Sequence, residues 1–344
     1  MEKPSDLPLA DELRRRGIRP NRKLGQNFMV DRQMLDFLVR SACLSQHDVV
    51  LEVGTGAGFL TQRLCEEAGE VISVEIDSGL FDLSRERLGG YENLVLIHAD
   101  ALAKDGGWNG TVKSAIKAAV THASGGVGER FQTIERSAVP GSRPGVDMAS
   151  EERPDRPDDA RRVGSTVDFR PLKMVANLPY SIATAVVQTA LAGSLEFADL
   201  WFTCQKEVAE RLSARPGSEN YGFISVLVAL LADIHVVRRL PATVFWPRPK
   251  VESAIVEIVP SAAKRQAAGD VEYLKVFLSR VFTQRRKRLV SVLKAMGLDE
   301  RSILEAGEIL DRRGAPPAER VFRITPEALA RIAECFANEG GRPQ

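Results

Sequence analysis

The chain has 344 residues, of which 44% are apolar and 27% charged, and a formal net charge of +1. A chain of this length can form two domains with a sizeable core. Its composition is that of an ordinary soluble protein and excludes protein classes that are defined by an extreme compositional bias. The longest apolar stretch, Ile224–Val237, is interrupted by polar residues and is too short to cross a bilayer. We therefore predict a buried helix there and no membrane partner.

Cysteine usage and the N-terminal residues both bear on the cellular compartment. The four cysteines are far apart, with no C-x-x-C pair and no histidine at metal-ligand spacing: Cys43, Cys65, Cys204 and Cys335. This pattern suits a reducing compartment and argues against a disulfide framework or a zinc site, so we expect no metal. The segment MEKPSDLPLADELRRR contains no apolar core for a signal peptide. We expect a cytoplasmic protein.

Basic residues are concentrated in two places. The stretch from Arg14 to Lys23 contains six basic residues and no acidic ones. The stretch from Tyr273 to Lys294 contains seven basic residues and no acidic ones. Either cluster alone is more simply explained as a solvated helix face. Two clusters that flank a catalytic-looking core favour a polyanionic partner.

From residue 48 the chain alternates strand-like and helix-like segments. Short apolar runs predict five strands, at Val49–Val53, Val71–Asp77, Leu94–Asp100, Leu172–Asn177 and Leu200–Gln205. The alternation indicates an α/β fold with a parallel, doubly wound, Rossmann-like sheet and helices on both faces. Ligands of such sheets bind outside the carboxyl ends of the strands, which is where the polar residues considered below are found.

Two segments depart from this alternation. Residues 103–168 contain a tract rich in Gly, Pro, Ser and mixed charge, which predicts an inserted surface loop that is disordered for much of its length. A helix over Thr111–His122 is expected at its base. After Pro260, apolar residues at helical spacing predict a small all-helical C-terminal domain, with Gly297 ending its first helix.

A glycine-rich turn follows the first predicted strand. Gly54, Gly56 and Gly58 have the spacing G-x-G-x-G, with Glu52 two residues ahead. Dinucleotide enzymes use G-x-G-x-x-G, whereas this pattern is more typical of S-adenosylmethionine sites. A plain turn is the alternative. No phosphate-binding lysine follows the glycines, which fits a cofactor without phosphates.

Two acids at the next strand ends strengthen this hypothesis. Glu75 lies about 20 residues beyond the glycines, where a carboxylate can bind both hydroxyls of a ribose. A solvated acid at a strand end is the structural alternative. Asp100, at the end of the third predicted strand, can accept a hydrogen bond from the amino group of adenine. Together these features predict S-adenosylmethionine and a methyltransferase.

The stretch N-L-P-Y at the end of the fourth predicted strand contains no catalytic base. The amino nitrogen of adenine is a poor nucleophile that needs orienting acceptors, and the Asn177 side-chain oxygen and the Leu178 carbonyl can supply them. Pro179 would fix the turn, and Tyr180 offers a ring for an extruded base. A helix N-cap with a turn proline fits these residues nearly as well in isolation. Beside a sulfonium cofactor, the catalytic interpretation is favoured.

These motifs resemble those of the ribosomal RNA adenine dimethyltransferases of the KsgA type. The resemblance runs from about Lys23 to the C-terminus apart from the insert. It is carried by KLGQNFMVD, LEVGTGAGFLT, VEID, HADAL, ANLPYSIAT, QKEVAERL, YGFISV, FWPRPKVESAIV and FTQRRKRL. It implies transfer of methyl groups to two adjacent adenosines in a hairpin near the 3′ end of small-subunit rRNA. It also implies a monomer that acts on small-subunit rRNA or a pre-30S particle during subunit biogenesis.

The resemblance also implies roles for individual residues. Asn27 and Met29 would contact the cofactor, together with Gly54, Glu75, Asp100 and Asn177. Phe245 would face Tyr180 across the target base. The basic residues implied to contact RNA are Arg22, Lys23, Arg248, Lys250, Arg285, Arg286, Lys287 and Arg288, although Arg285 is close to an apolar stripe and has a structural alternative. The domains would be 1–30, a basic segment leading into the cofactor site; 31–260, the methyltransferase domain; and 261–344, a helical RNA-binding domain.

The sequence departs from the family pattern in a few places. The family's N-L-P-Y-N-I-S-T-P is N-L-P-Y-S-I-A-T-A here, so Ser181, Ala183 and Ala185 leave the key residues intact but bear on the packing beneath them. Two alternatives stay open. One is a large-subunit rRNA methyltransferase of the macrolide-resistance type, against which FTQRRKRL and the extended helical tail argue. The other is a non-catalytic ribosome-assembly factor, against which Glu75, Asp100 and the intact N-L-P-Y argue.

Overall fold

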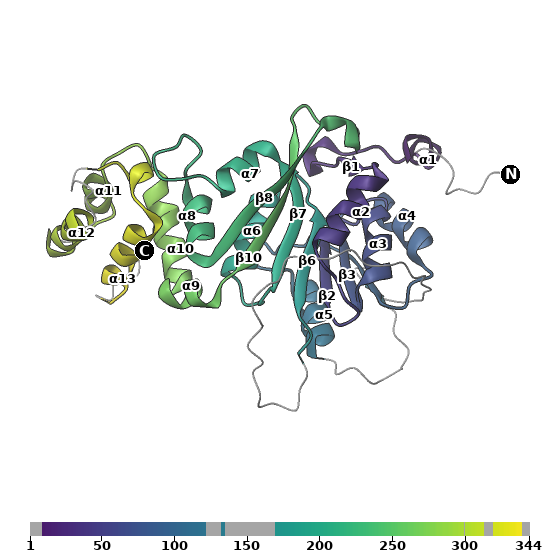
Figure 1. The fold of residues 1–344 in the computed structure, drawn as a ribbon, viewed down its shortest axis with the longest axis horizontal. Coiled ribbons are helices and arrows are strands. Elements are labelled where there is room, and N and C mark those ends of the chain that lie inside the picture. Colours follow the sequence, from purple (N-terminus) through teal and green to yellow (C-terminus); the bar gives the residue numbers. More distant parts are fainter. Residues whose placement is uncertain (1–8, 122–131, 135–168, 299, 313–318, 339–344) are drawn as a thin grey trace. The chain divides into compact units, whose positions relative to one another are not determined.

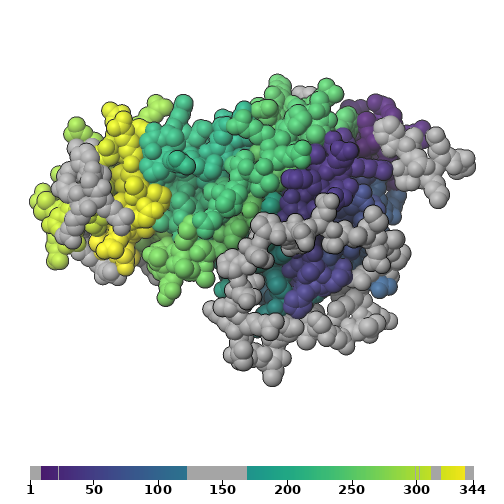
Figure 2. All heavy atoms as spheres, viewed as in Figure 1, coloured from purple at the N-terminus to yellow at the C-terminus, as the bar shows by residue number. Residues whose placement is uncertain are grey.

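The structure is a computed structural model that describes residues 9–121, 132–134, 169–298, 300–312 and 319–338; other residues are grey in Figures 1 and 2. Its contacts divide the chain into two compact units. The first comprises Met1–Asn177 and Thr243–Arg248, and the second comprises Leu178–Ala242 and Pro249–Gln344. The three domains expected from the sequence remain a prediction.

The first unit is built on parallel strands in the order β5-β4-β3-β2-β6, of which β3, β2 and β6 are labelled in Figure 1. Their bounds are β2 (Val49–Val53), β3 (Glu70–Glu75), β4 (Leu94–His98), β5 (Gln132–Ile134) and β6 (Leu172–Asn177). All five residues of β2 are buried, as expected for a central parallel strand. The strands predicted for β2 and β6 are confirmed at both ends, and those for β3 and β4 end two residues earlier than predicted.

The insert contains one element that the sequence analysis missed. Strand β5 pairs with β4 in parallel, so the prediction of a loop is wrong at Gln132–Ile134. Only three residues form the strand, too few for a periodic apolar pattern to identify it. The predicted disorder at 122–131 and 135–168 lies outside the described residues.

Short elements and helices complete the first unit: α1 (Leu9–Arg15), η2 (Arg22–Leu24), β1 (Phe28–Met29), α2 (Arg32–Ser41), α3 (Phe59–Glu67), α4 (Ser78–Leu88), α5 (Gly110–Thr121) and β9 (Phe245–Trp246). α3 and α4 contact β3, and α5 contacts β2 and β3. α4 begins directly after β3 because the Asp77 side chain caps it, accepting from the Leu80 amide at 3.1 Å. The helix expected at Thr111–His122 is confirmed up to Thr121 as α5, and His122 lies outside the described residues.

The strands of the second unit are antiparallel, in the order β7-β10-β8. They are β7 (Asp199–Gln205), β8 (Ala232–Leu240) and β10 (Ser253–Pro260). A wholly parallel arrangement is therefore wrong for this part, although the α/β class is confirmed. The helix predicted over Ile224–Val237 is also wrong in its second half. It ends at Leu231, and the chain continues as β8, whose edge can pair with β10 only in an extended conformation.

Helices make up the rest of the second unit: α6 (Ala183–Ala192), α7 (Lys206–Leu212), α8 (Phe223–Leu231), α9 (Ala262–Ala267), α10 (Val271–Phe282), α11 (Leu289–Ala295), α12 (Glu300–Arg312), η4 (Val321–Arg323) and α13 (Pro326–Asn338); η3 (Ala242–Val244) lies at the boundary between the units. After Pro260, every described element is helical. In the described part of the chain, no helix has the length and apolar character needed to cross a membrane.

The long helix predicted to end at Gly297 is interrupted between Phe282 and Leu289. There the backbone bonds outside the helix, since the Val321 amide donates to the Lys287 carbonyl at 3.1 Å. The Arg285 guanidinium also donates to two backbone carbonyls of the loop between α7 and α8. These contacts hold the basic segment as a turn, which the helical spacing of the apolar residues on either side does not reveal.

Candidate active site

The turn between β2 and α3 forms a cradle in which every second residue is a glycine. Gly54, Gly56 and Gly58 have φ angles of 89°, 58° and 81°, in the left-handed region that disfavours other residues. A Cβ at Gly56 would lie 3.1 Å from a carbon of the Phe28 ring. The turn therefore requires glycine at Gly56 for two reasons, backbone conformation and space.

Glu75 lies at the end of β3 with its carboxylate directed at this turn. One oxygen accepts from the Gly56 amide at 2.8 Å, and the other accepts from the Ile76 and Asp77 amides at 2.9 Å each. Only 4% of the residue is exposed. Burial raises the pKa of the Glu75 carboxyl, and the amide hydrogen bonds oppose that rise. The arrangement holds an acceptor beside the glycine cradle.

Asp100 lies one strand further along the same edge. The Ala99 amide donates to the Glu75 carbonyl at 2.9 Å, which holds the ends of β3 and β4 together. The Asp100 side chain is exposed and accepts from the Leu102 amide at 3.0 Å. Ile76, directly after Glu75, leaves 46% of its surface exposed although it is apolar. Two carboxylates, an exposed apolar side chain and a glycine cradle fit a nucleoside-containing cofactor such as S-adenosylmethionine.

A second buried carboxyl lies beneath the turn, and the sequence analysis used it only as a spacing marker. Glu52 is 1% exposed and accepts from the hydroxyls of Thr61 at 2.6 Å and Ser73 at 2.5 Å. Burial raises its pKa to about 8, with the two hydroxyls partly opposing the rise. Its contacts connect β2 to α3 and β3. An acid inside the otherwise apolar run VVLEV was the signal that could have identified it.

Four of the predicted site residues form two contacting pairs in the first unit, at β1, β6 and β9. The Asn177 side-chain amide donates to the Asn27 backbone carbonyl at 2.9 Å, although the two residues are 150 positions apart. Met29 pairs with Phe245 between β1 and β9, and both are buried. The segment GQNFM therefore contacts both the start of N-L-P-Y and strand β9.

The remaining residues of N-L-P-Y begin the second unit. The Leu178 amide donates to the Thr203 carbonyl at 3.2 Å, and the Ile182 amide donates to the Pro179 carbonyl at 3.1 Å. Tyr180 is half-buried, and its hydroxyl forms a 2.6 Å hydrogen bond with Ser253, which the sequence analysis did not single out. Burial raises the pKa of the Tyr180 phenol, with the Ser253 bond opposing the rise. The ring is thus held at its polar end.

The predicted RNA-contacting residues differ in exposure. Six are exposed: Lys23, Arg248, Lys250, Arg286, Lys287 and Arg288. Arg22 begins η2. Arg285 is half-buried and donates to the carbonyls of Glu219 at 2.8 Å and Tyr221 at 2.7 Å, which gives it a structural role. In the N-terminal basic cluster, Arg14 pairs with Asp11 and Arg16 with Glu86, so this cluster is partly neutralised.

Comparison with known proteins extends over most of the chain. A family described as ribosomal RNA adenine dimethylase matches residues 17–312. Ribosomal RNA small subunit methyltransferase A of Clostridium botulinum (strain Loch Maree) is 31% identical over 316 residues, covering 92% of this chain and 94% of the relative. The protein of the same name from Pelotomaculum thermopropionicum is 31% identical over 331 residues, covering 96% of each.

Two solved structures share the fold. A dimethyladenosine transferase from Plasmodium falciparum superposes with a TM-score of 0.62 at 19% identity, covering 92% of this chain and all of that one. The 23S rRNA methyltransferase ErmE superposes with a TM-score of 0.54 at 23% identity, covering 90% of this chain and all of that one.

The described residues contain no group of three or more His, Cys, Asp or Glu placed to hold a metal ion.

Proposed function

Because the chain belongs to the ribosomal RNA adenine dimethylase family, we propose that it dimethylates two adjacent adenosines of small-subunit rRNA. The methyl groups would come from S-adenosylmethionine, and the target would lie in a hairpin near the 3′ end of the RNA. The family match over residues 17–312 supports this proposal, as do the names of the relatives. The observation that carries it is the Asn177 amide, fixed by the Asn27 carbonyl at the carboxyl end of β6.

The cofactor would be held by residues of the first unit. Glu75 would accept from the ribose hydroxyls, Asp100 from the adenine amine, and the turn at Gly54 would let the backbone approach closely. Asn27 and Met29 would contact the cofactor from the segment GQNFM, and Asn177 would contact it from the end of β6. When bound, S-adenosylmethionine supplies an electrophilic methyl group on a sulfonium. The three amides that donate to the Glu75 carboxylate hold it in place at the end of β3.

Orientation of the amine would be the main task of N-L-P-Y. The Asn177 nitrogen donates to Asn27, which sets the plane of the amide and makes its oxygen the acceptor we assign to the adenine amine. The Leu178 carbonyl would be the second acceptor, in a turn shaped by Pro179. Two acceptors on the amine protons direct the nitrogen lone pair at the methyl group, so no strong base is needed.

The target base would stack on Tyr180, and a role for Phe245 stays a prediction from the family resemblance. Tyr180 suits this role because the hydroxyl bond to Ser253 fixes the ring without covering it fully. Phe245 is only 1% exposed, so its ring can meet a base only after its surroundings rearrange. This requirement makes Tyr180 the stronger candidate of the two aromatic residues.

We assign RNA affinity to the exposed basic residues, chiefly those of the segment 286–288. They neutralise phosphates irrespective of sequence, while the helical residues after Pro260 would position them. We further propose that the protein acts as a monomer on small-subunit rRNA or a pre-30S particle, in the cytoplasm, during subunit biogenesis. Neither a metal nor a membrane enters this proposal.

The deciding experiment is incubation with labelled S-adenosylmethionine and unmodified small subunits, followed by nucleoside analysis for dimethyladenosine. Asn177→Ala should reduce methyl transfer by about 100- to 1,000-fold at saturating cofactor, with little change in subunit binding. Charge reversal at Arg286 and Lys287 should do the converse. Normal transfer by the Asn177 variant would refute the orientation mechanism.

The same assay separates the alternatives. Methylation of large-subunit rRNA alone would establish the macrolide-resistance type of activity. Tight subunit binding without methylation of any unmodified rRNA would establish an assembly factor. Dimethyladenosine in small-subunit rRNA at two adjacent positions would support the proposal.

A further inference from the structure

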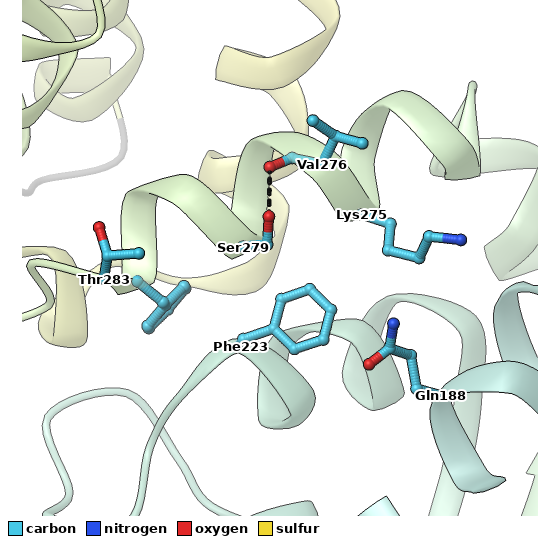
Figure 3. A pocket seen from close by; sticks show the side chains of 7 residues that line it. Gln188, Phe223, Lys275, Val276, Ser279 and Thr283 are labelled. Carbon is cyan, nitrogen blue, oxygen red and sulfur yellow. Dashed lines mark hydrogen bonds between the residues drawn. The ribbon is translucent and has the colours of Figure 1, made fainter. Parts of the chain in front are cut away.

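A pocket of about 510 Å³ lies in the second unit among α6, α8 and α10, and no function above makes use of it. Its lining consists of Gln188, Phe223, Lys275, Val276, Ser279, Phe282 and Thr283 (Figure 3). The volume is within the range of pockets that bind small organic groups. All of these residues belong to one compact unit, so the pocket depends on no other part of the chain.

Aromatic and apolar groups form the floor of the pocket. Phe223 is half-buried at the start of α8, and its ring is directed towards α10 (Figure 3). Val276 on α10 leaves 38% of its surface exposed despite being apolar. Phe282 is held edge-on by Tyr221, with ring centroids 5.9 Å apart. A flat, apolar ligand could therefore stack on the Phe223 ring.

Polar groups lie around this apolar floor. Gln188 on α6 and Lys275 on α10 lie at one end of the pocket, and Thr283 lies at the other (Figure 3). The hydroxyls of Ser279 and Thr283 donate to carbonyls of their own helix, at 2.8 Å and 2.6 Å, which leaves their oxygens able to accept. Lys275 is 28% exposed and pairs with Glu272 at 2.6 Å. The amide offers both a donor and acceptors, and the ammonium offers a positive charge that Glu272 partly neutralises in the free protein.

An unpaired nucleobase with its phosphate matches this set of groups. Proteins bind single-stranded RNA by stacking bases on aromatic rings, reading base edges with amides and hydroxyls, and neutralising phosphates with lysine or arginine. A lipid chain would make no hydrogen bond with the Gln188 amide. A simple anion would not stack on the Phe223 ring.

The pocket is connected by sequence to both functional segments of the second unit. α6 begins at Ala183, three residues after Tyr180, and Gln188 follows after five helical residues, a rise of about 7.5 Å. α10 ends at Phe282, four residues before the exposed basic segment 286–288. The pocket is therefore lined by two helices, one of which begins just after Tyr180 and the other of which ends just before the basic segment.

We propose that the pocket binds an unpaired base of the substrate RNA, at a nucleotide close to the two target adenosines but distinct from them. This inference rests on the proposed function. The site would fix the register of the RNA, so that the correct adenosine reaches Tyr180.

The first test compares two phenylalanine-to-leucine variants. Phe223→Leu keeps apolar bulk but removes the stacking ring, and it should weaken binding of an RNA hairpin from the 3′ end of small-subunit rRNA by about 10-fold. Phe37→Leu is the matched control, since Phe37 is also half-buried but belongs to the first unit. It should bind the hairpin like wild type. Fluorescence anisotropy measures both affinities, and thermal denaturation checks that both variants are folded.

The second test places an abasic nucleotide at each unpaired position of the hairpin in turn. At one position outside the target pair, wild type should lose about 10-fold in affinity, and Phe223→Leu should lose nothing further. Gln188→Leu removes only the amide and should show a weaker coupling to the same abasic position. This variant keeps the test valid if Phe223→Leu is poorly folded. If no position is coupled to Phe223 or Gln188, the proposal is overturned.

Failure of the inference can be told apart from failure of the proposed function. If wild type dimethylates small-subunit rRNA but the pocket variants bind and methylate with unchanged KM, the pocket has no role and the function stands. If wild type methylates no small-subunit rRNA, the proposed function fails, and this inference fails with it.

Discussion

Replacing Glu52 by glutamine should alter how the stability of the first unit depends on pH. Glu52 is 1% exposed, and burial raises its pKa to about 8 from 4.5 in a solvated carboxyl. Between these values the folded protein keeps a proton that the unfolded chain has lost. Raising the pH therefore favours unfolding, so the contribution is complete below pH 4.5 and is lost as the pH rises to about 8.

The magnitude follows from one proton per molecule. Each pH unit inside this window lowers the free energy of unfolding by at most about 1.4 kcal/mol, or roughly 2.5 kcal/mol between pH 5.5 and 7.5. Glu52→Gln stays neutral and retains an oxygen that can accept from Thr61 and Ser73. The difference in unfolding free energy, variant minus wild type, should thus increase by about 2.5 kcal/mol over these two pH units.

Urea denaturation followed by tryptophan fluorescence measures this difference. The chain has three tryptophans, of which Trp108 and Trp246 belong to the first unit and Trp201 to the second. Replacing Trp201 by phenylalanine in both proteins restricts the signal to the unit that contains Glu52. Parallel pH profiles of the two proteins would show that Glu52 is ionised in the folded state and would refute the reasoning.

Three further predictions concern the cofactor cradle and the substrate ring. Glu75→Ala should weaken S-adenosylmethionine binding by about 2–3 kcal/mol in calorimetry, and unchanged affinity would remove Glu75 from the site. Gly56→Ala should lower the free energy of unfolding by about 1–2 kcal/mol, more than Gly17→Ala, because Gly17 shares the positive φ but has no neighbour like the Phe28 ring. Tyr180→Phe, which keeps the ring but removes its bond to Ser253, should lower kcat less than Tyr180→Ala, which should reduce it about 100-fold in the subunit methylation assay.

Strands that end in glycine or asparagine were predictable from sequence alone. β2 and β6 are apolar runs that stop at Gly54 and Asn177, and the structure ends both strands where the pattern ends. Parallel strands buried on both faces need continuous apolar residues, so the sequence pattern and the structure coincide there.

The boundary between α8 and β8 could not be predicted in the same way. The run from Phe223 to Val237 is apolar enough to continue as a helix, and only pairing with β10 makes residues after Leu231 extended. β-structure depends on the partner strand more than on local preference, and here the partner follows later in the chain. The break at Arg285 has a similar cause, since distant carbonyls hold that turn.

Motif spacing located the candidate site, but its contacts required the structure. Glu75 and Asp100 follow from their places at strand ends. The bond from Asn177 to Asn27 joins residues 150 positions apart, and no local pattern encodes it. Glu52 was overlooked as a buried acid because a glutamate in a strand is usually solvent-facing, and its hydroxyl partners become apparent only in three dimensions.

Anchoring distinguishes two sets of polar residues in this chain, and the difference predicts which substitutions separate catalysis from binding. Asn177 and Tyr180 each have a side-chain hydrogen bond inside the protein, to Asn27 and Ser253, so their geometry is set before a substrate arrives. Preorganised groups of this kind act on the transition state rather than on affinity. Arg286 and Lys287 are exposed and suited to mobile phosphate contacts, which contribute affinity without orientation. Under the proposed function, catalysis without a base would demand rigidity at N-L-P-Y, while RNA binding would not demand it of the basic segment.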